Sequence, residues 1–279
     1  MSSPRLGVKK TYKLLINGAL VRTESGRSLE GPTGDNVPWA SRKDVRDAVR
    51  AAHSAFPKWS GATAYNRGQI LYRLAEMVEA RSSEFERLVK AEGSADSSRE
   101  VAVSCDRLVH YAGWCDKFAQ VAGCVNPVSG PYFDFSVPEP MGVVAVAVGP
   151  GAPVLALVSQ LAPVIASGNT AVVLADDGAP ATACELGETL TTSDIPAGVV
   201  NVLCGKQSET LQAAVAHKEV DAIDMVGTVP DEKFWAGAAD NLKRIGHHGP
   251  HEWLEPTAQG IAWIERYVET KTVWHPVGV

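Results

Sequence analysis

The feature that most constrains the fold is a charge-free segment from Met141 to Ala175. It is long enough to span a bilayer. However, the residues Gly149-Pro150-Gly151-Ala152-Pro153 interrupt it, and Ser167-Gly168-Asn169 interrupt it again. Such breaks would leave backbone groups without hydrogen-bond partners in lipid. The segment is therefore interpreted as a strand, a crossover helix and a second strand buried inside an α/β protein, not as a membrane span.

The same pattern continues along the chain. Short apolar strands are predicted at 143–148, 170–174, 199–203 and 222–226, and helix-length segments lie between them at 154–166, 180–192 and 207–216. This alternation predicts an α/β fold with a Rossmann-like parallel sheet and flanking helices. Glycines end three of the strands (Gly149, Gly205 and Gly227) and place loops at the carboxyl edge, where α/β folds bind ligands.

The residues before this sheet predict a hairpin followed by helices. Asn17-Gly18 is a favoured two-residue turn within a hairpin over 12–22. Apolar residues at helical spacing predict helices over 41–56, 66–91 and 99–120. The segment 243–259 has no periodicity and is expected to be a linker, and 269–275 is a single β-prone segment.

Composition limits the partners and the compartment. The formal net charge of −6 argues against nucleic-acid binding, which needs a basic surface. Five cysteines without CxxC spacing favour reduced thiols, and no secretory signal is visible, so a cytoplasmic protein is expected. His247, His248 and His251 are the one candidate metal cluster, but their Gly and Pro neighbours indicate a flexible loop, and no metal site is predicted.

Several ordered motifs resemble the NAD(P)-dependent aldehyde dehydrogenase superfamily. They include INGALV (16–21), DAVRAAHSAFPKWS (47–60), GPYFDFSVPEPMGVVAVAV (130–148), LAPVIASGNTAVVL (161–174) and IPAGVVNVLCG (195–205). The tail IERYVETKTVW (264–274) is similar to the last residues of those enzymes. The resemblance implies an NAD-binding domain formed by 1–124 and 141–242, and an oligomerisation arm formed by 125–140 and 260–279. The linker at 243–259 would stand where the family has its catalytic domain.

The resemblance also shows which catalytic positions have changed. No cysteine follows Cys204, so the family's nucleophile has no counterpart, and without a thiolate no hydride donor can form. The oxyanion-hole asparagine aligns with Gly151 and the neighbouring tryptophan with Pro150, while 247–250 offers no match for the general-base glutamate. No catalytic residue is assigned, and the chain is not expected to be an enzyme on its own.

The cofactor positions are only partly kept. Gly227 and Thr228 match the family's glycine-plus-hydroxyl pair near the pyrophosphate, and Asp177 could accept a hydrogen bond from a ribose hydroxyl. The family's ribose-binding lysine aligns with Ala175, and a later glycine aligns with Glu232, whose charge would oppose phosphate. NAD binding is therefore expected to be weak or absent.

The segments that resemble the oligomerisation arm lead to a hypothesis about function. In the family, this arm adds strands to the catalytic-domain sheet of a neighbouring subunit, and the chain keeps the donor but not the acceptor. The leading hypothesis is a catalytically inactive subunit that assembles with a full-length aldehyde dehydrogenase and stabilises or regulates it. Two alternatives remain: the NAD-binding half of a composite dehydrogenase whose cysteine comes from a partner, and a self-associating binding module. The candidate arm residues are Tyr132, Phe133, Phe135, Val137, Glu269, Thr270, Lys271, Thr272, Val273 and Trp274.

Overall fold

A computed structural model of the 279-residue chain describes residues 7–249 and 251–278. Residues 1–6 of the predicted NAD-binding domain, Pro250 of the predicted linker and Val279 of the predicted arm lie outside the described residues.

A seven-stranded sheet forms the centre of the molecule, in the order β11-β10-β7-β8-β9-β1-β2. The strands from β11 to β9 run parallel, whereas β1 pairs antiparallel with both β9 and β2. This mixed, mostly parallel arrangement confirms the predicted α/β fold. The strands are β1 (Leu14–Ile16), β2 (Ala19–Val21), β7 (Val143–Ala147), β8 (Thr170–Leu174), β9 (Val200–Leu203), β10 (Ala222–Val226) and β11 (Arg244–His248). A separate hairpin joins β3 (Ser28–Glu30) to β4 (Asn36–Pro38).

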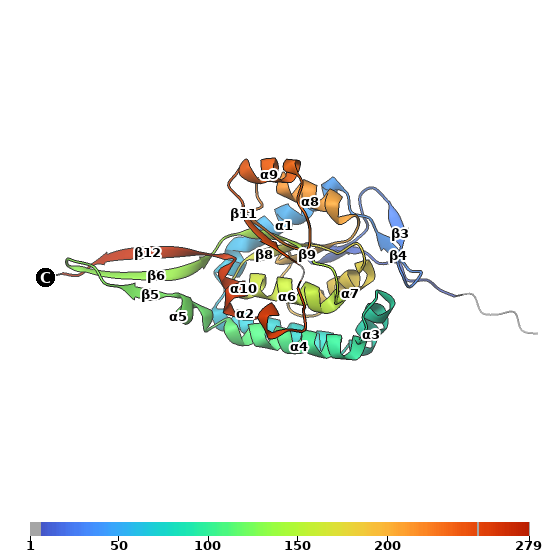
Figure 1. The fold of residues 1–279 in the computed structure, drawn as a ribbon, viewed down its shortest axis with the longest axis horizontal. Coiled ribbons are helices and arrows are strands. Elements are labelled where there is room, and N and C mark those ends of the chain that lie inside the picture. Colours follow the sequence, from blue (N-terminus) through green and yellow to red (C-terminus); the bar gives the residue numbers. More distant parts are fainter. Residues whose placement is uncertain (1–6, 250, 279) are drawn as a thin grey trace, which may run out of the picture.

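Helices cover both faces of this sheet (Figure 1). The helices α1, α8 and α9 lie on one face, and α2, α3, α4, α6, α7 and α10 lie on the other. Their bounds are α1 (Arg42–Ser60), α2 (Ala64–Glu79), α3 (Ser82–Ala91), α4 (Ser97–Trp114), α5 (Phe118–Ala122), α6 (Pro153–Ala166), α7 (Pro180–Leu190), α8 (Gln207–Val215), α9 (Glu232–Ala239) and α10 (Ile261–Glu265), with a short 3₁₀ helix at Pro256–Ala258.

Burial explains why the central segment carries no charge. Every residue of β7, β8 and α6 is buried, because the strands lie between two helical layers and α6 is itself covered by α4. A charged side chain at these positions would lose its hydration without gaining a partner. No helix in the described part of the chain is both long and apolar enough to cross a membrane.

Two of the predicted long helices are interrupted. The predicted helix over 66–91 is divided into α2 and α3 at Arg81, whose backbone leaves the helical region. The guanidinium of Arg81 donates to Glu185 and Thr189 of α7, so a tertiary contact lies at the break. The predicted helix over 99–120 similarly ends as α4 at Trp114, and α5 follows.

The segment 243–259 is not simply a linker, and this prediction is corrected. Residues Arg244–His248 form β11, which pairs in parallel with β10 and extends the central sheet. Farther along, Trp253 and Ala258 are buried in the main core. The guanidinium of Arg107, on α4, donates to the carbonyls of both residues and holds the segment against the body. Sequence periodicity missed this because most of the segment is irregular and is held by long-range contacts.

The predicted arm is a separate three-stranded sheet in the order β12-β6-β5. It consists of β5 (Cys124–Asn126), β6 (Tyr132–Pro140) and β12 (Val268–Pro276), and β6 and β12 pair antiparallel along their whole lengths. The β-prone tail thus pairs with a segment more than a hundred residues earlier. Figure 1 shows this arm extending away from the body, with the end of β12 near its tip.

Candidate functional site

The topology identifies where a nucleotide would bind. The chain passes from β7 outward through β8 to β9, then returns to place β10 and β11 on the other side of β7. The carboxyl ends of β7 and β10 therefore flank a topological switch point, the usual ligand crevice of an open α/β sheet. Gly149 follows β7 here and Gly227 follows β10, so two of the predicted loop glycines lie at this crevice.

An indole from the segment after β11 occupies this crevice. Trp253 is 3% exposed, and its Nε1–H donates to the carbonyl of Pro150 at 3.1 Å. A Cβ added at Gly149 would lie 3.1 Å from the Trp253 ring and 2.8 Å from Val226. Gly149 thus permits the close approach of Trp253 to the end of β7. The indole lines one side of a cavity of about 390 Å³, which is also bounded by residues 150–152 and 251–254.

Gln207, the first residue of α8, hydrogen-bonds to two of the predicted cofactor residues, Asp177 and Thr228. Its Nε2 donates to the carbonyls of Val148 and Leu174, at the ends of β7 and β8. Its backbone N–H donates to Asp177 Oδ1 at 2.6 Å, and its Oε1 accepts from the Thr228 hydroxyl at 3.5 Å. Asp177 and Thr228 are therefore both engaged with Gln207, one through its backbone and the other through its side chain.

Gly227 directly follows β10 and extends its pairing with β11 by one hydrogen bond. Its φ of +70° belongs to the left-handed region, and its N–H donates to the carbonyl of His248 at 2.9 Å. His247 Nε2 hydrogen-bonds to the carbonyl of Thr228 at 2.8 Å. Within the described residues, no three His, Cys, Asp or Glu side chains are grouped as metal ligands. The rings of His248 and His251 instead stack at 6.3 Å, beside Trp263.

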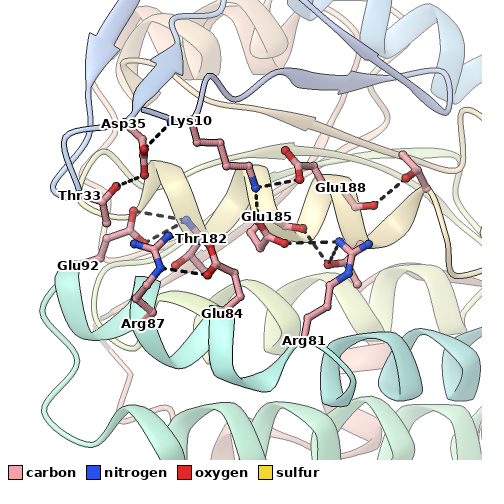
Figure 2. Close-up of polar contacts among 12 residues, drawn as sticks. Lys10, Thr33, Asp35, Arg81, Glu84, Arg87, Glu92, Thr182, Glu185 and Glu188 are labelled. Carbon is pink, nitrogen blue, oxygen red and sulfur yellow. Dashed lines mark hydrogen bonds and ion pairs between the residues drawn. The ribbon is translucent and has the colours of Figure 1, made fainter. Parts of the chain in front are cut away.

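Carboxylates of the chain also occupy the N-termini of two crossover helices. Glu100 accepts from the backbone N–H groups of Val154 and Leu155 in the first turn of α6. Glu92 accepts in the same way from Ala181 and Thr182 at the start of α7, in the polar cluster drawn in Figure 2. Burial raises the pKa of both carboxyls, and their hydrogen bonds with these helix termini oppose that shift. The N–H groups at the starts of α6 and α7 are thus already satisfied by the chain's own carboxylates, and neither helix terminus is free to bind a phosphate.

The cysteines of the body lack the environment of a nucleophile. Burial raises the pKa of Cys105 and of Cys115 to about 12, and it raises the pKa of Cys184 well above its ordinary value. A catalytic cysteine needs the opposite shift, because the thiolate is the reactive form. Cys204 is also buried, with its Sγ 3.1 Å from that of Cys184.

The arm has two chemically different faces. Directly opposed residues of an antiparallel sheet point to the same side, so Val125, Phe135 and Val273 form one row across the three strands. Phe133 extends this apolar face, with its ring 5.5 Å from that of Phe135. Val137, Glu269 and Lys271 continue the same face toward the body, by the alternation of the strands.

The opposite face of the arm is more polar. Asn126 donates to Asp134 and to Ser136, and the hydroxyls of Ser136 and Thr272 lie 2.8 Å apart. The structure thus places the predicted arm residues on one small sheet but divides them between its faces. Those on the polar face are Tyr132, Thr270, Thr272 and Trp274.

Sequence reasoning missed Gln207, Trp253 and Glu100. Gln207 had a local signal, because it opens a helix two residues after the glycine that follows β9. Trp253 and Glu100 had none, since each reaches the carboxyl edge only through tertiary packing.

Comparisons with known proteins agree with this architecture. The sequence pattern of the aldehyde dehydrogenase family matches residues 28–246. Human retinal dehydrogenase 2 is 31% identical over 258 residues, covering 87% of this chain and 49% of its own length. The Arabidopsis thaliana protein named aldehyde dehydrogenase family 2 member B4, mitochondrial, is 30% identical, covering 87% of this chain and 47% of its own length. The chain thus spans about half the length of the curated relatives that it matches.

Solved structures give the same result. PnpE from Pseudomonas sp. WBC-3 is 29% identical with a TM-score of 0.78, covering 85% of this chain and 50% of PnpE. A second PnpE structure, with the same identity and TM-score, is a complex with nicotinamide adenine dinucleotide. The family pattern covers more than half of the residues, and the chain therefore belongs to the aldehyde dehydrogenase family.

Proposed function

We propose that this chain is a non-catalytic member of its family that assembles with a full-length aldehyde dehydrogenase and stabilises or regulates it. The observation that carries the proposal is the arm. It extends from the body with Tyr132, Phe133 and Trp274 between 44% and 58% exposed. In the described part of the chain, β12 and β5 pair only with β6, so each leaves one edge open. Open strand edges and exposed aromatic side chains of this kind are satisfied by association with another chain.

The carboxyl edge supports the non-catalytic part of the proposal. Trp253 packs at the switch point and donates to the carbonyl of Pro150, and Gln207 engages Asp177 and Thr228. The sequence offers no cysteine beyond Cys204, and the cysteines of the body are buried. A subunit with these properties would contribute contacts to an assembly and not a reaction of its own.

The relative in complex with NAD favours one other function. A partner could supply the cysteine while this chain binds the nucleotide, as the NAD-binding half of a composite dehydrogenase. In that case a nucleotide that contacted Asp177 or Thr228 would have to displace their hydrogen bonds with Gln207. The non-catalytic subunit needs no such rearrangement.

Co-expression with a full-length aldehyde dehydrogenase encoded in the same genome tests the proposal. We expect one complex of defined mass by size-exclusion chromatography with light scattering at micromolar concentration. Phe133→Asp places a charge on the apolar face of the arm and should weaken the complex by about tenfold or more. Thr270→Asp, on the opposite face of the same sheet, is the matched control and should have a smaller effect.

Two outcomes would contradict the proposal. Separate peaks for the unmodified chain and the enzyme would exclude a stable complex. A defined oligomer of the chain alone that excludes the enzyme would instead favour the self-associating module.

A further inference from the structure

A basic groove lies between α1 and the C-terminal end of α8, away from the carboxyl edge. Its volume is about 380 Å³, within the range of small-molecule sites. Four cations of α1 line one side, and a histidine and a glutamate that follow α8 line the other. These residues are Arg42, Lys43, Arg46, Arg50, His217 and Glu219.

The charges of the groove are only partly neutralised. Lys43 pairs with Glu24, and Arg46 pairs with Asp47 at 2.8 Å. Arg42 and Arg50 have no carboxylate within 4.0 Å among the residues that the structure describes. This local excess of positive charge contrasts with the net charge of −6 on the whole chain.

The arginines are spaced to bind more than one anionic group. Arg42, Arg46 and Arg50 recur every four residues, so they share one face of α1 and span roughly 12 Å along its axis. Each guanidinium offers a planar pair of donors that matches a phosphate or carboxylate. A ligand with a single charge would satisfy only one of them.

His217 adds a neutral hydrogen-bond donor to the groove, and its pKa depends on the charges around it. Its Nδ1 accepts from the backbone N–H of Glu219 at 3.3 Å, so in the neutral ring the proton is on Nε2. Burial lowers the pKa of His217, and the nearby charges of Arg50, Lys243 and Arg46 lower it further, while Glu219 acts in the opposite direction. Two further cations, Arg42 and Lys43, line the same groove as His217.

We propose that this groove binds a small molecule that carries two or more phosphoryl groups, held by Arg42 and Arg50 with Arg46 between them. The lining is mostly charged, and only Ala213 and Ala216 offer apolar contact, so recognition depends on the phosphates. The net charge of −6 on the chain disfavours nucleic acid as the ligand. The proposal is independent of the arm and of any assembly.

Inorganic tripolyphosphate is a suitable probe, with orthophosphate for comparison. Isothermal titration calorimetry on the full chain should show tripolyphosphate binding about tenfold or more tightly than orthophosphate, and binding should weaken as salt increases. The double variant Arg42→Gln/Arg50→Gln should lose at least tenfold in affinity. Arg73→Gln/Arg87→Gln, which changes two exposed arginines on α2 and α3, is the matched control and should bind normally.

A second readout follows from His217. Bound phosphates offset the neighbouring cations, so tripolyphosphate should raise the pKa of His217 in an NMR titration of the ring protons. The Arg42→Gln/Arg50→Gln variant should titrate without this response to the probe. Absence of binding at millimolar tripolyphosphate, or unchanged affinity in that variant, would overturn the proposal. Tighter binding of an oligoglutamate peptide than of tripolyphosphate would also overturn it, in favour of an acidic protein segment.

Discussion

Single residues occupy the hydrogen-bonding groups at the carboxyl edge of the sheet. Glu100 shows this most directly, because the residue is 3% exposed and its carboxyl caps the first turn of α6. Burial raises its pKa, although the two backbone donors oppose the shift. The folded protein therefore holds this proton to a higher pH than the unfolded chain. Its contribution to stability is present below the ordinary value of about 4.5 and is lost as pH rises through the folded pKa.

Glu100→Gln should remove this pH dependence. The amide oxygen can still accept from the N-terminus of α6, but it carries no charge to desolvate. We expect the free energy of unfolding to fall less steeply between pH 4 and pH 7 in Glu100→Gln than in the unmodified chain, measured by urea unfolding. Glu265→Gln, at an exposed position, is the control. Equal slopes for Glu100→Gln and the unmodified chain would contradict this account.

At the scale of elements, the N-terminal segment is held to α7 by charge. Lys10 Nζ lies 2.7 Å from Glu185 and 2.9 Å from Glu188, in the cluster shown in Figure 2. These two carboxylates raise the pKa of Lys10 despite its partial burial, which lowers it. The carboxylate of Glu185 is only 5% exposed, so it depends on Lys10 and Arg81 for compensation.

Lys10→Ala should destabilise the chain because it leaves a buried carboxylate with one partner fewer. We expect a loss of about 1–3 kcal/mol in the free energy of unfolding. Lys9→Ala removes the neighbouring pair with Glu30, in which both side chains are at least 60% exposed, and should cost less than about 0.5 kcal/mol. Chemical denaturation measures the free energy of unfolding of both variants. Equal losses would show that the contact of Lys10 with the buried Glu185 stabilises the chain no more than an exposed ion pair does.

In the whole molecule, polar groups at the carboxyl edge of the central sheet already have partners within the chain, whereas the arm has strand edges without partners in the described residues. Because Thr228 and Asp177 already hydrogen-bond to Gln207, and Trp253 packs against the loop after β7, we expect the isolated chain to bind NAD weakly or not at all. Titration with NAD up to millimolar concentration should give no saturable change in tryptophan fluorescence, and no NADH should form with an aldehyde. A full-length relative treated identically is the control. Saturable quenching would support the composite-enzyme alternative, and NADH formation would contradict a non-catalytic role.

Local sequence patterns determined the main elements of the sheet. The apolar runs at 143–148, 170–174, 199–203 and 222–226 all became buried parallel strands, because a strand covered on both faces must be mostly apolar. The buried Asn201 and Asp224 are exceptions, and each hydrogen-bonds within the core. Asn17-Gly18 forms the turn predicted for it, with positive φ at both residues. Ordered family motifs supplied the rest of the architecture, including the arm.

What only the tertiary structure decided is the state of the candidate site. The segment 243–259 has no period, so nothing local shows that it adds β11 to the sheet and inserts Trp253 at the switch point. Glu100 and Gln207 act on groups tens of residues away in the chain, through contacts that depend on how the helices pack. Periodicity reports which face of an element is buried, whereas the filling of a crevice depends on which distant side chains meet there, and that is a property of the packed molecule.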